Sequence, residues 1–269
     1  MSSFGYAAFA NIIRMILCIV IGFVLILITG DFKNLIPNRE LLLISLLSGV
    51  STAVFVVTWL ISVKKSAYMM LDIFLMLGIL IPLIASSVFF EEAIRLTQWL
   101  GLVVLFTAVL IMCSYNNTIK EKLTPASLLL MVMCGAVNGI ADLSQKLFAK
   151  CIPGGSAAVF NFYTYIFAAV SLMLFFAVTR EKGEAIDQAN IKKIFSYILI
   201  MAISLFANSY FKTLASEHLS AVLLYPLNQG CALILSAVMA AVLFRERLTA
   251  KAVFGILTAF AGLLIINVL

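Results

Sequence analysis

Two long apolar runs joined by a short charged turn end this chain, and they limit what it can fold into. The runs are Val222–Phe244 and Ala250–Leu269, and the turn reads Arg245-Glu246-Arg247-Leu248-Thr249. Each run has about 20 residues, the length that a helix needs to cross ~30 Å of hydrocarbon. Such continuous runs predict membrane helices, because a membrane barrel is built from alternating segments of about ten residues.

The same pattern occurs earlier in the chain at a fixed offset. Gly255 follows Glu246 by nine residues, and Gly101 follows Glu92 by nine residues, so the two turns are 246 − 92 = 154 residues apart. The same offset separates two Ser-Ala dipeptides, Ser66-Ala67 and Ser220-Ala221. Each dipeptide precedes the apolar run that ends at a charged turn. The sequence therefore predicts two copies of one membrane unit.

Composition excludes several classes of protein. The chain is 64% hydrophobic and 11% charged, whereas a soluble domain is about half apolar and a quarter charged. The net charge of +6 is spread over short loops, which is typical of membrane insertion and predicts no nucleic-acid partner. Five scattered cysteines without a C-x-x-C spacing and a single histidine, His218, indicate no metal and no cofactor.

Nine membrane spans are expected, connected by short loops that hold most of the charge. They are Ala7–Thr29, Leu41–Val63, Ala67–Phe90, Thr97–Ser114, Pro125–Ala149, Ser156–Thr179, Ile194–Leu214, Ala221–Phe244 and Ala250–Leu269. The fold class is thus all-α and integral to the membrane.

The offset of 154 pairs the last four spans with the first four, while the fifth span has no partner. We therefore expect a five-helix unit that occurs once complete, in residues 119–269, and once without its first helix, in residues 1–118. An odd number of helices gives the two copies opposite orientations, which is the inverted repeat of many secondary transporters.

On these residues the chain resembles the two-repeat, EamA-type permeases of the drug/metabolite transporter superfamily. Glu92 with Gly101, Glu246 to Thr249 with Gly255, the two Ser-Ala pairs and Arg14 in the first span carry the resemblance. It implies a small-molecule permease or exporter, not an enzyme, in the cell membrane. Alternating access about a cavity between the repeats would move a small polar or cationic solute.

The resemblance also implies ten helices, of which the first in each repeat lines the cavity. Because the first helix is missing here, a transport-inactive fragment or partner subunit remains an alternative, as does a homo-oligomer or a partner that supplies the helix. Membrane orientation stays open, because the family and the Lys/Arg distribution point in opposite directions. An intramembrane lipid-phosphate enzyme is a further alternative, but it would need clustered histidines, carboxylates or arginines at membrane depth.

The fifth span carries the clearest candidate site. Asn138, Asp142 and Gln145 fall at i, i+4 and i+7, which is one face of a helix. Lys146 lies four residues after Asp142, the favourable order for an ion pair within a helix. These residues either line a polar cavity and bind the solute or a coupling ion, or Asp142 and Lys146 only neutralise each other. Gly135 and Gly139 in the same span allow a close helix approach.

Other spans supply further substrate-binding candidates. In the eighth span, Pro226 disturbs the helix and Tyr225, Asn228 and Gln229 share a face, which favours cavity lining over interhelical hydrogen bonding. Asp72 in the third span either titrates or pairs with Arg14. The remaining candidates are Asn208, Tyr210 and Trp59. Glu92 and Glu246 are interpreted as turn residues that stabilise helix starts.

Overall fold

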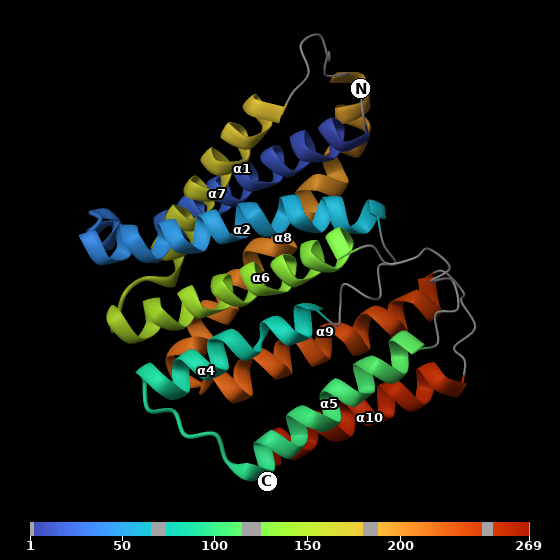
Figure 1. Ribbon diagram of the computed structural model, residues 1–269. Coiled ribbons are helices and arrows are strands. Elements are labelled where there is room, and N and C mark those ends of the chain that lie inside the picture. The colour runs from blue at the N-terminus through green and yellow to red at the C-terminus, as the bar shows by residue number, and fades with distance from the viewer. Residues whose placement is uncertain (1–2, 66–73, 115–124, 180–187, 244–249, 269) are drawn as a thin grey trace. The chain divides into compact units, whose positions relative to one another are not determined.

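The computed structural model describes residues 3–65, 74–114, 125–179, 188–243 and 250–268, and every regular element within them is helical. The elements are α1 (Ser3–Thr29), the 3-10 helix η1 (Asp31–Leu35), α2 (Arg39–Lys65), α4 (Leu80–Phe89), α5 (Leu96–Ser114), α6 (Pro125–Cys151), α7 (Ala157–Thr179), α8 (Gln188–His218), α9 (Ala221–Leu243) and α10 (Ala250–Val268), as Figure 1 shows.

Each of the nine expected spans overlaps one of these helices, although the third, Ala67–Phe90, is described only from residue 74. Five described helices are long and apolar enough to cross a membrane: Ala7–Thr29, Arg39–Ser62, Pro125–Cys151, Ala157–Thr179 and Ile194–His218. The expectation of an all-α membrane protein is confirmed, while the number of nine crossings stays a prediction.

Local signals explain where the helices begin and end. The Asn38 side chain accepts a hydrogen bond from Leu41 N–H at 2.7 Å and caps α2. Ser156 Oγ accepts one from Val159 N–H at 3.4 Å and caps α7. After α1 the chain turns at Gly30, whose φ of +73° is a left-handed conformation that glycine adopts without a steric cost.

The chain packs as two compact units, and it passes from one to the other within α2, within α6 and between α8 and α9. Unit 1 comprises Met1–Leu60 and Ile140–His218, and unit 2 comprises Ile61–Gly139 and Leu219–Leu269. Each unit therefore combines a segment of the first expected repeat with a segment of the second.

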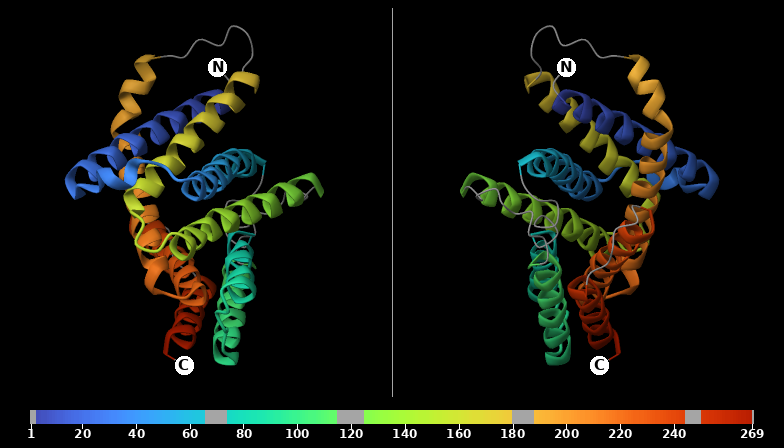
Figure 2. Two further views of the ribbon diagram at one scale, coloured as in Figure 1. Left: turned by 90° about the vertical axis from the view of Figure 1, so that its left-hand side faces the viewer. Right: turned by 90° about the vertical axis from the view of Figure 1, so that its right-hand side faces the viewer.

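In unit 1, α1 packs against α7 and α8, as two further views show (Figure 2). Phe9 in the early part of α1 lies 6.5 Å, ring to ring, from Phe176 near the end of α7. Phe23 near the end of α1 lies 6.1 Å from Phe162 near the start of α7. The two helices are therefore antiparallel.

In unit 2, α10 packs along α5 (Figure 1) and also contacts α9. The backbones of α5 and α10 approach closely: a Cβ added at Gly101 would lie 2.9 Å from Ile266 N, and one added at Gly262 would lie 2.9 Å from Leu105 N. The start of α5 thus faces the end of α10, and this pair is antiparallel as well.

In each unit, one pair of packed helices consists of helices that the offset of 154 relates. Subtracting 154 from the bounds of α10 gives 96–114, which are the bounds of α5. The same subtraction moves the start of α7 to residue 3, where α1 begins.

Within unit 2, the first half of α6 lies in direct backbone contact with the segment that begins at residue 74. A Cβ added at Gly135 would stand 2.0 Å from Phe74 O, and one added at Gly139 would stand 2.2 Å from Gly78 O. No side chain fits at these distances, so the close approach expected of Gly135 and Gly139 is confirmed.

Candidate functional site

A connected set of polar side chains lies inside unit 1 on α6, α7 and α8, and we call it the polar tract. Its members are Asp142, Gln145, Lys146, Asn161, Tyr165, Ser209, Lys212, Thr213 and Ser216. Polar and charged groups within membrane helices are costly and are retained where they pair or serve a function. The tract is therefore the first candidate for a functional site.

An ion pair joins α6 to α8 at one end of the tract. Lys212 Nζ lies 2.5 Å from Asp142 Oδ1, and the two side chains are only 13% and 7% exposed. A buried pair of this kind is a strong geometric constraint, because each ion would be unstable there without the other. It fixes the two helices at this level.

A chain of neutral hydrogen bonds continues from α6 through α8 to α7. Gln145 Nε2 donates to Ser209 Oγ at 3.3 Å, and Ser209 Oγ donates to Asn161 Oδ1 at 2.5 Å. Asn161 Nδ2 in turn donates to Thr213 Oγ1 at 3.1 Å and to Ala157 O at 2.8 Å. Asn161 and Thr213 are fully buried, so these bonds form away from water.

Lys146 is almost fully buried and also points toward α8. Its Nζ donates to the backbone carbonyl of Ser216 at 3.2 Å, while Ser216 Oγ donates to the carbonyl of Gln145 at 3.2 Å. α6 is thus linked to α8 by two lysines, one from each helix.

One hydrogen-bond acceptor of the tract has no donor among the described residues. Gln145 is 5% exposed, and its Oε1 atom is buried without a hydrogen-bond partner in the part of the chain that the structure describes. An unpaired buried carbonyl oxygen loses the hydrogen bonds that water would supply. A donor group of a bound molecule would restore one of them.

The structure brings three of the sequence candidates together within unit 1. Asp142, Gln145 and Lys146 belong to the tract. Asn138 is half-buried in the part of α6 that belongs to unit 2, and Asn208 is exposed on α8. Of the other described candidates, one is buried, Tyr225, and four are half-buried: Trp59, Tyr210, Asn228 and Gln229. Asp72 and its expected pairing with Arg14 lie outside the described residues.

The sequence reasoning missed the α8 side of the tract. Ser209, Thr213 and Ser216 fall at i, i+4 and i+7, so they share a face as the α6 candidates do. Lys212 lies on the same face, three residues after Ser209. The helical spacing of these small polar residues is the sequence signal that identifies this face of α8.

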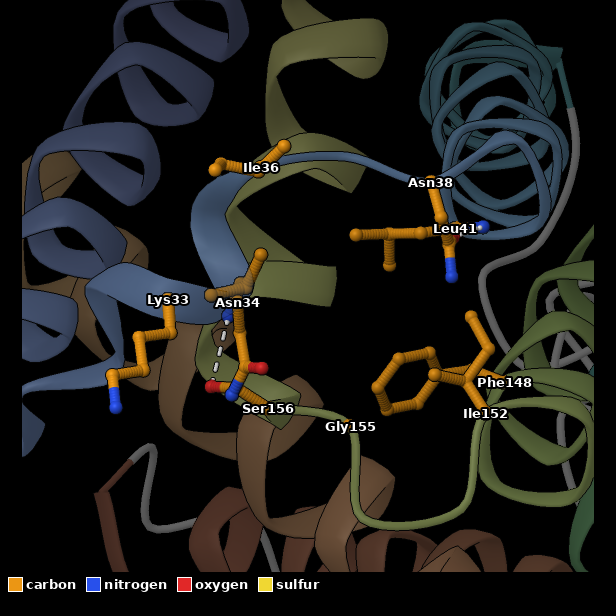
Figure 3. Close-up of a pocket in the computed structure, with 10 residues that line it drawn as sticks. Lys33, Asn34, Ile36, Asn38, Leu41, Phe148, Ile152, Gly155 and Ser156 are labelled. Atoms are coloured by element: carbon orange, nitrogen blue, oxygen red, sulfur yellow. Dashed lines mark hydrogen bonds between the residues drawn. The ribbon is translucent and has the colours of Figure 1, made fainter.

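The same unit also has a separate cavity of about 120 Å³ at its helix ends (Figure 3). η1, the starts of α2 and α7 and the end of α6 line it. Asn34, Asn38 and Ser156 provide polar groups, and Leu41 and Phe148 provide an apolar wall. None of the sequence candidates lines this cavity, and the tract residues are not part of it.

Glu92, interpreted from the sequence as a turn and helix-start residue, contacts the start of α9, whereas the helix that follows its own turn is α5. Glu92 Oε2 accepts a hydrogen bond from Ala221 N–H at 2.8 Å, which places a negative charge at the first residue of α9. Glu246 lies outside the described residues. Within those residues there is no group of three or more His, Cys, Asp or Glu side chains that could hold a metal ion.

The fold and the tract define a class: a multi-pass helical membrane protein with a polar interior. Comparison with protein families then identifies the family. The model of the EamA-like transporter family matches residues 121–268, more than half of the chain, and the chain belongs to this family. The resemblance inferred from the two charged turns is thereby confirmed, and the chain is a transporter of the drug/metabolite type.

Solved structures support the fold over nearly the whole chain. A crystal structure whose title reads only "Crystal structure of protein" superposes with a TM-score of 0.79 at 12% sequence identity. The match covers 97% of this chain and 87% of the other. A search of curated proteins finds no match.

Proposed function

We propose that the chain is a permease of the cell membrane that moves a small polar solute. In this proposal it works by alternating access about a cavity between two inverted repeats, residues 1–118 and 119–269. The polar tract of unit 1 would provide part of the solute site.

The unpaired oxygen of Gln145 is the observation that carries this proposal. The tract satisfies most of its own polar groups, so a purely structural network would be expected to satisfy this one too. Instead Gln145 uses only its amide nitrogen, toward Ser209, and leaves a buried acceptor for another molecule. A solute that offers an N–H or O–H group fits that role.

The packing of related helices supports the repeat mechanism. α1 with α7 and α5 with α10 are pairs that the offset of 154 relates, and both pairs are antiparallel. Opposite directions in equivalent helices are what an inverted repeat requires. Two equivalent halves of this kind can exchange conformations, which opens a site alternately to the two sides of a membrane.

Uptake into proteoliposomes tests the proposal. Purified protein is reconstituted, and uptake of radiolabelled amino acids, nucleosides and a cationic dye is compared with that of protein-free vesicles. We expect at least one polar solute to enter faster with the protein present. Gln145→Leu, which has a similar volume, should slow that uptake about five- to tenfold, because one hydrogen bond is worth about 1–1.5 kcal/mol and 1.4 kcal/mol is tenfold.

Thr179→Val is the matched control, because Thr179 is exposed and its hydroxyl donates to the Phe175 carbonyl within α7. It should leave the uptake rate unchanged. Absence of protein-dependent uptake for every solute would contradict the proposal and favour a transport-inactive subunit. Equal uptake by the wild type and Gln145→Leu would remove Gln145 from the solute site.

A further inference from the structure

Arg14 is a cation inside unit 1 that the polar tract does not neutralise. It lies in α1 between buried residues, Ile12, Met15 and Cys18. Its Nε atom is buried without a hydrogen-bond partner, and no described residue forms an ion pair with its guanidinium. Arg14 as a whole is half-buried, and a guanidinium that is partly withdrawn from water in a membrane helix is costly unless an anion compensates it.

Arg14 adjoins the tract through Tyr165. The guanidinium and the Tyr165 hydroxyl are close enough to interact electrostatically, and Ser209 lies within hydrogen-bonding reach of the same hydroxyl. Ser209 is the residue that accepts a hydrogen bond from Gln145. A continuous series of polar groups therefore leads from Arg14 on α1, through α7 and α8, to the unpaired oxygen of Gln145 on α6.

Among the tract residues, the acidic side chain is that of Asp142, and it already forms an ion pair with Lys212. Asp142 lies 2.5 Å from Lys212 and is the anion of that pair. The two ends of the series thus offer complementary groups: a positive charge with an unpaired, buried Nε–H donor at Arg14, and an unpaired neutral acceptor at Gln145.

We propose that Arg14 binds the carboxylate of the transported solute, while Gln145 Oε1 accepts a hydrogen bond from an N–H or O–H group of the same solute. This inference rests on the proposed function and narrows its substrate class. The planar fork of a guanidinium matches a carboxylate with two parallel hydrogen bonds. A carboxylate carries a single negative charge and balances the single positive charge of Arg14, whereas a phosphate brings about −1.5 to −2.

Thermal stability with matched ligands tests the proposal. Melting temperatures of the purified protein are measured with L-leucine, L-phenylalanine and lactate, each against its primary amide, leucinamide, phenylalaninamide and lactamide. Each amide keeps the size of its acid and loses the negative charge. We expect at least one acid to raise the melting temperature by about 5 °C at saturation, and its amide to raise it far less.

Two variants assign the effect to Arg14. Arg14→Gln should abolish the difference between acid and amide, and Arg14→Lys, which keeps the charge but loses the fork, should keep part of it. Arg39→Gln is the matched control, since it removes the same charge from an exposed position at the start of α2. It should leave the difference unchanged.

The outcomes separate this inference from the proposed function. If acids and amides stabilise the wild type equally, or if Arg14→Gln keeps the difference, the carboxylate site is wrong while a permease for neutral or cationic solutes still stands. If Arg14→Gln does not fold, a partial response in Arg14→Lys supports the inference and a full response contradicts it. Failure of every solute here and in the uptake assay would contradict both proposals.

Discussion

Replacing Lys212 by methionine should destabilise the protein more than any substitution at an exposed position. The change keeps most of the side chain's length and removes the cation of Lys212 from the buried carboxylate of Asp142. At 2.5 Å, two unit charges attract by about 7 kcal/mol at an effective dielectric constant of ~20. Removal of both ions from water costs several kcal/mol each, so the net contribution of the pair is small. Loss of one partner, however, should cost about 3–5 kcal/mol.

A double-mutant cycle isolates this interaction. The free energy of unfolding in mixed micelles is measured for Lys212→Met, for Asp142→Asn and for the double variant. We expect the double variant to recover most of the loss, because both charges are then absent. A second cycle with Lys146→Met and Asp142→Asn is the control, since the sequence offers that pair as an alternative partnership within α6.

Two results would refute the reasoning. One is a coupling energy between positions 142 and 212 below about 0.5 kcal/mol, which is the level expected of an exposed pair. The other is a larger coupling of Asp142 with Lys146 than with Lys212, which would restore the partnership within α6 as the dominant one.

Further predictions concern two glycines and the start of α9. Gly139→Ala should destabilise by about 1–3 kcal/mol in the same unfolding assay, because the new methyl group would lie 2.2 Å from Gly78 O. Gly154→Ala, with open space around it and a φ of +73°, should cost only about 1 kcal/mol, and a larger loss there than at Gly139 would contradict the packing argument. Glu92→Gln should cost about 0.5–1 kcal/mol, because it removes the charge beside Ala221 N–H at the start of α9. Glu91→Gln, at the preceding and exposed position, should leave the free energy of unfolding unchanged. Equal losses for Glu91→Gln and Glu92→Gln would argue against a role of Glu92 at the helix start.

Helix positions were predictable because the apolar runs are long and are separated by charge. α10 begins at Ala250 and α6 begins at Pro125, both where the expected spans begin. The seventh span was placed at Ile194–Leu214, whereas α8 runs from Gln188 to His218. A helix can continue beyond the hydrocarbon, where hydropathy no longer marks its ends.

The polar tract was only half predictable. On α6, Asp142 and Gln145 stand out because strongly polar residues at helical spacing are rare in an apolar run. On α8, Ser209 and Thr213 are only weakly polar in hydropathy, so the more polar Asn208 was the stronger signal although it is exposed. Nor could the sequence choose the partner of Asp142: a lysine four residues away is visible in the chain, whereas one 70 residues away becomes a neighbour only after folding.

Access of water and solute to the tract is the central claim, and labelling of a cysteine at position 209 tests it most directly. Ser209→Cys is made in a variant that lacks the five native cysteines. The reaction rate with a small, membrane-impermeant, charged thiol reagent is then measured in proteoliposomes. Ile203→Cys, exposed on the same helix, is the control for a position that faces lipid. We predict that the cysteine at 209 reacts much faster than the one at 203, and that a solute which is taken up slows it. A folded Ser209→Cys protein that reacts no faster than the control, with or without solute, would contradict the account.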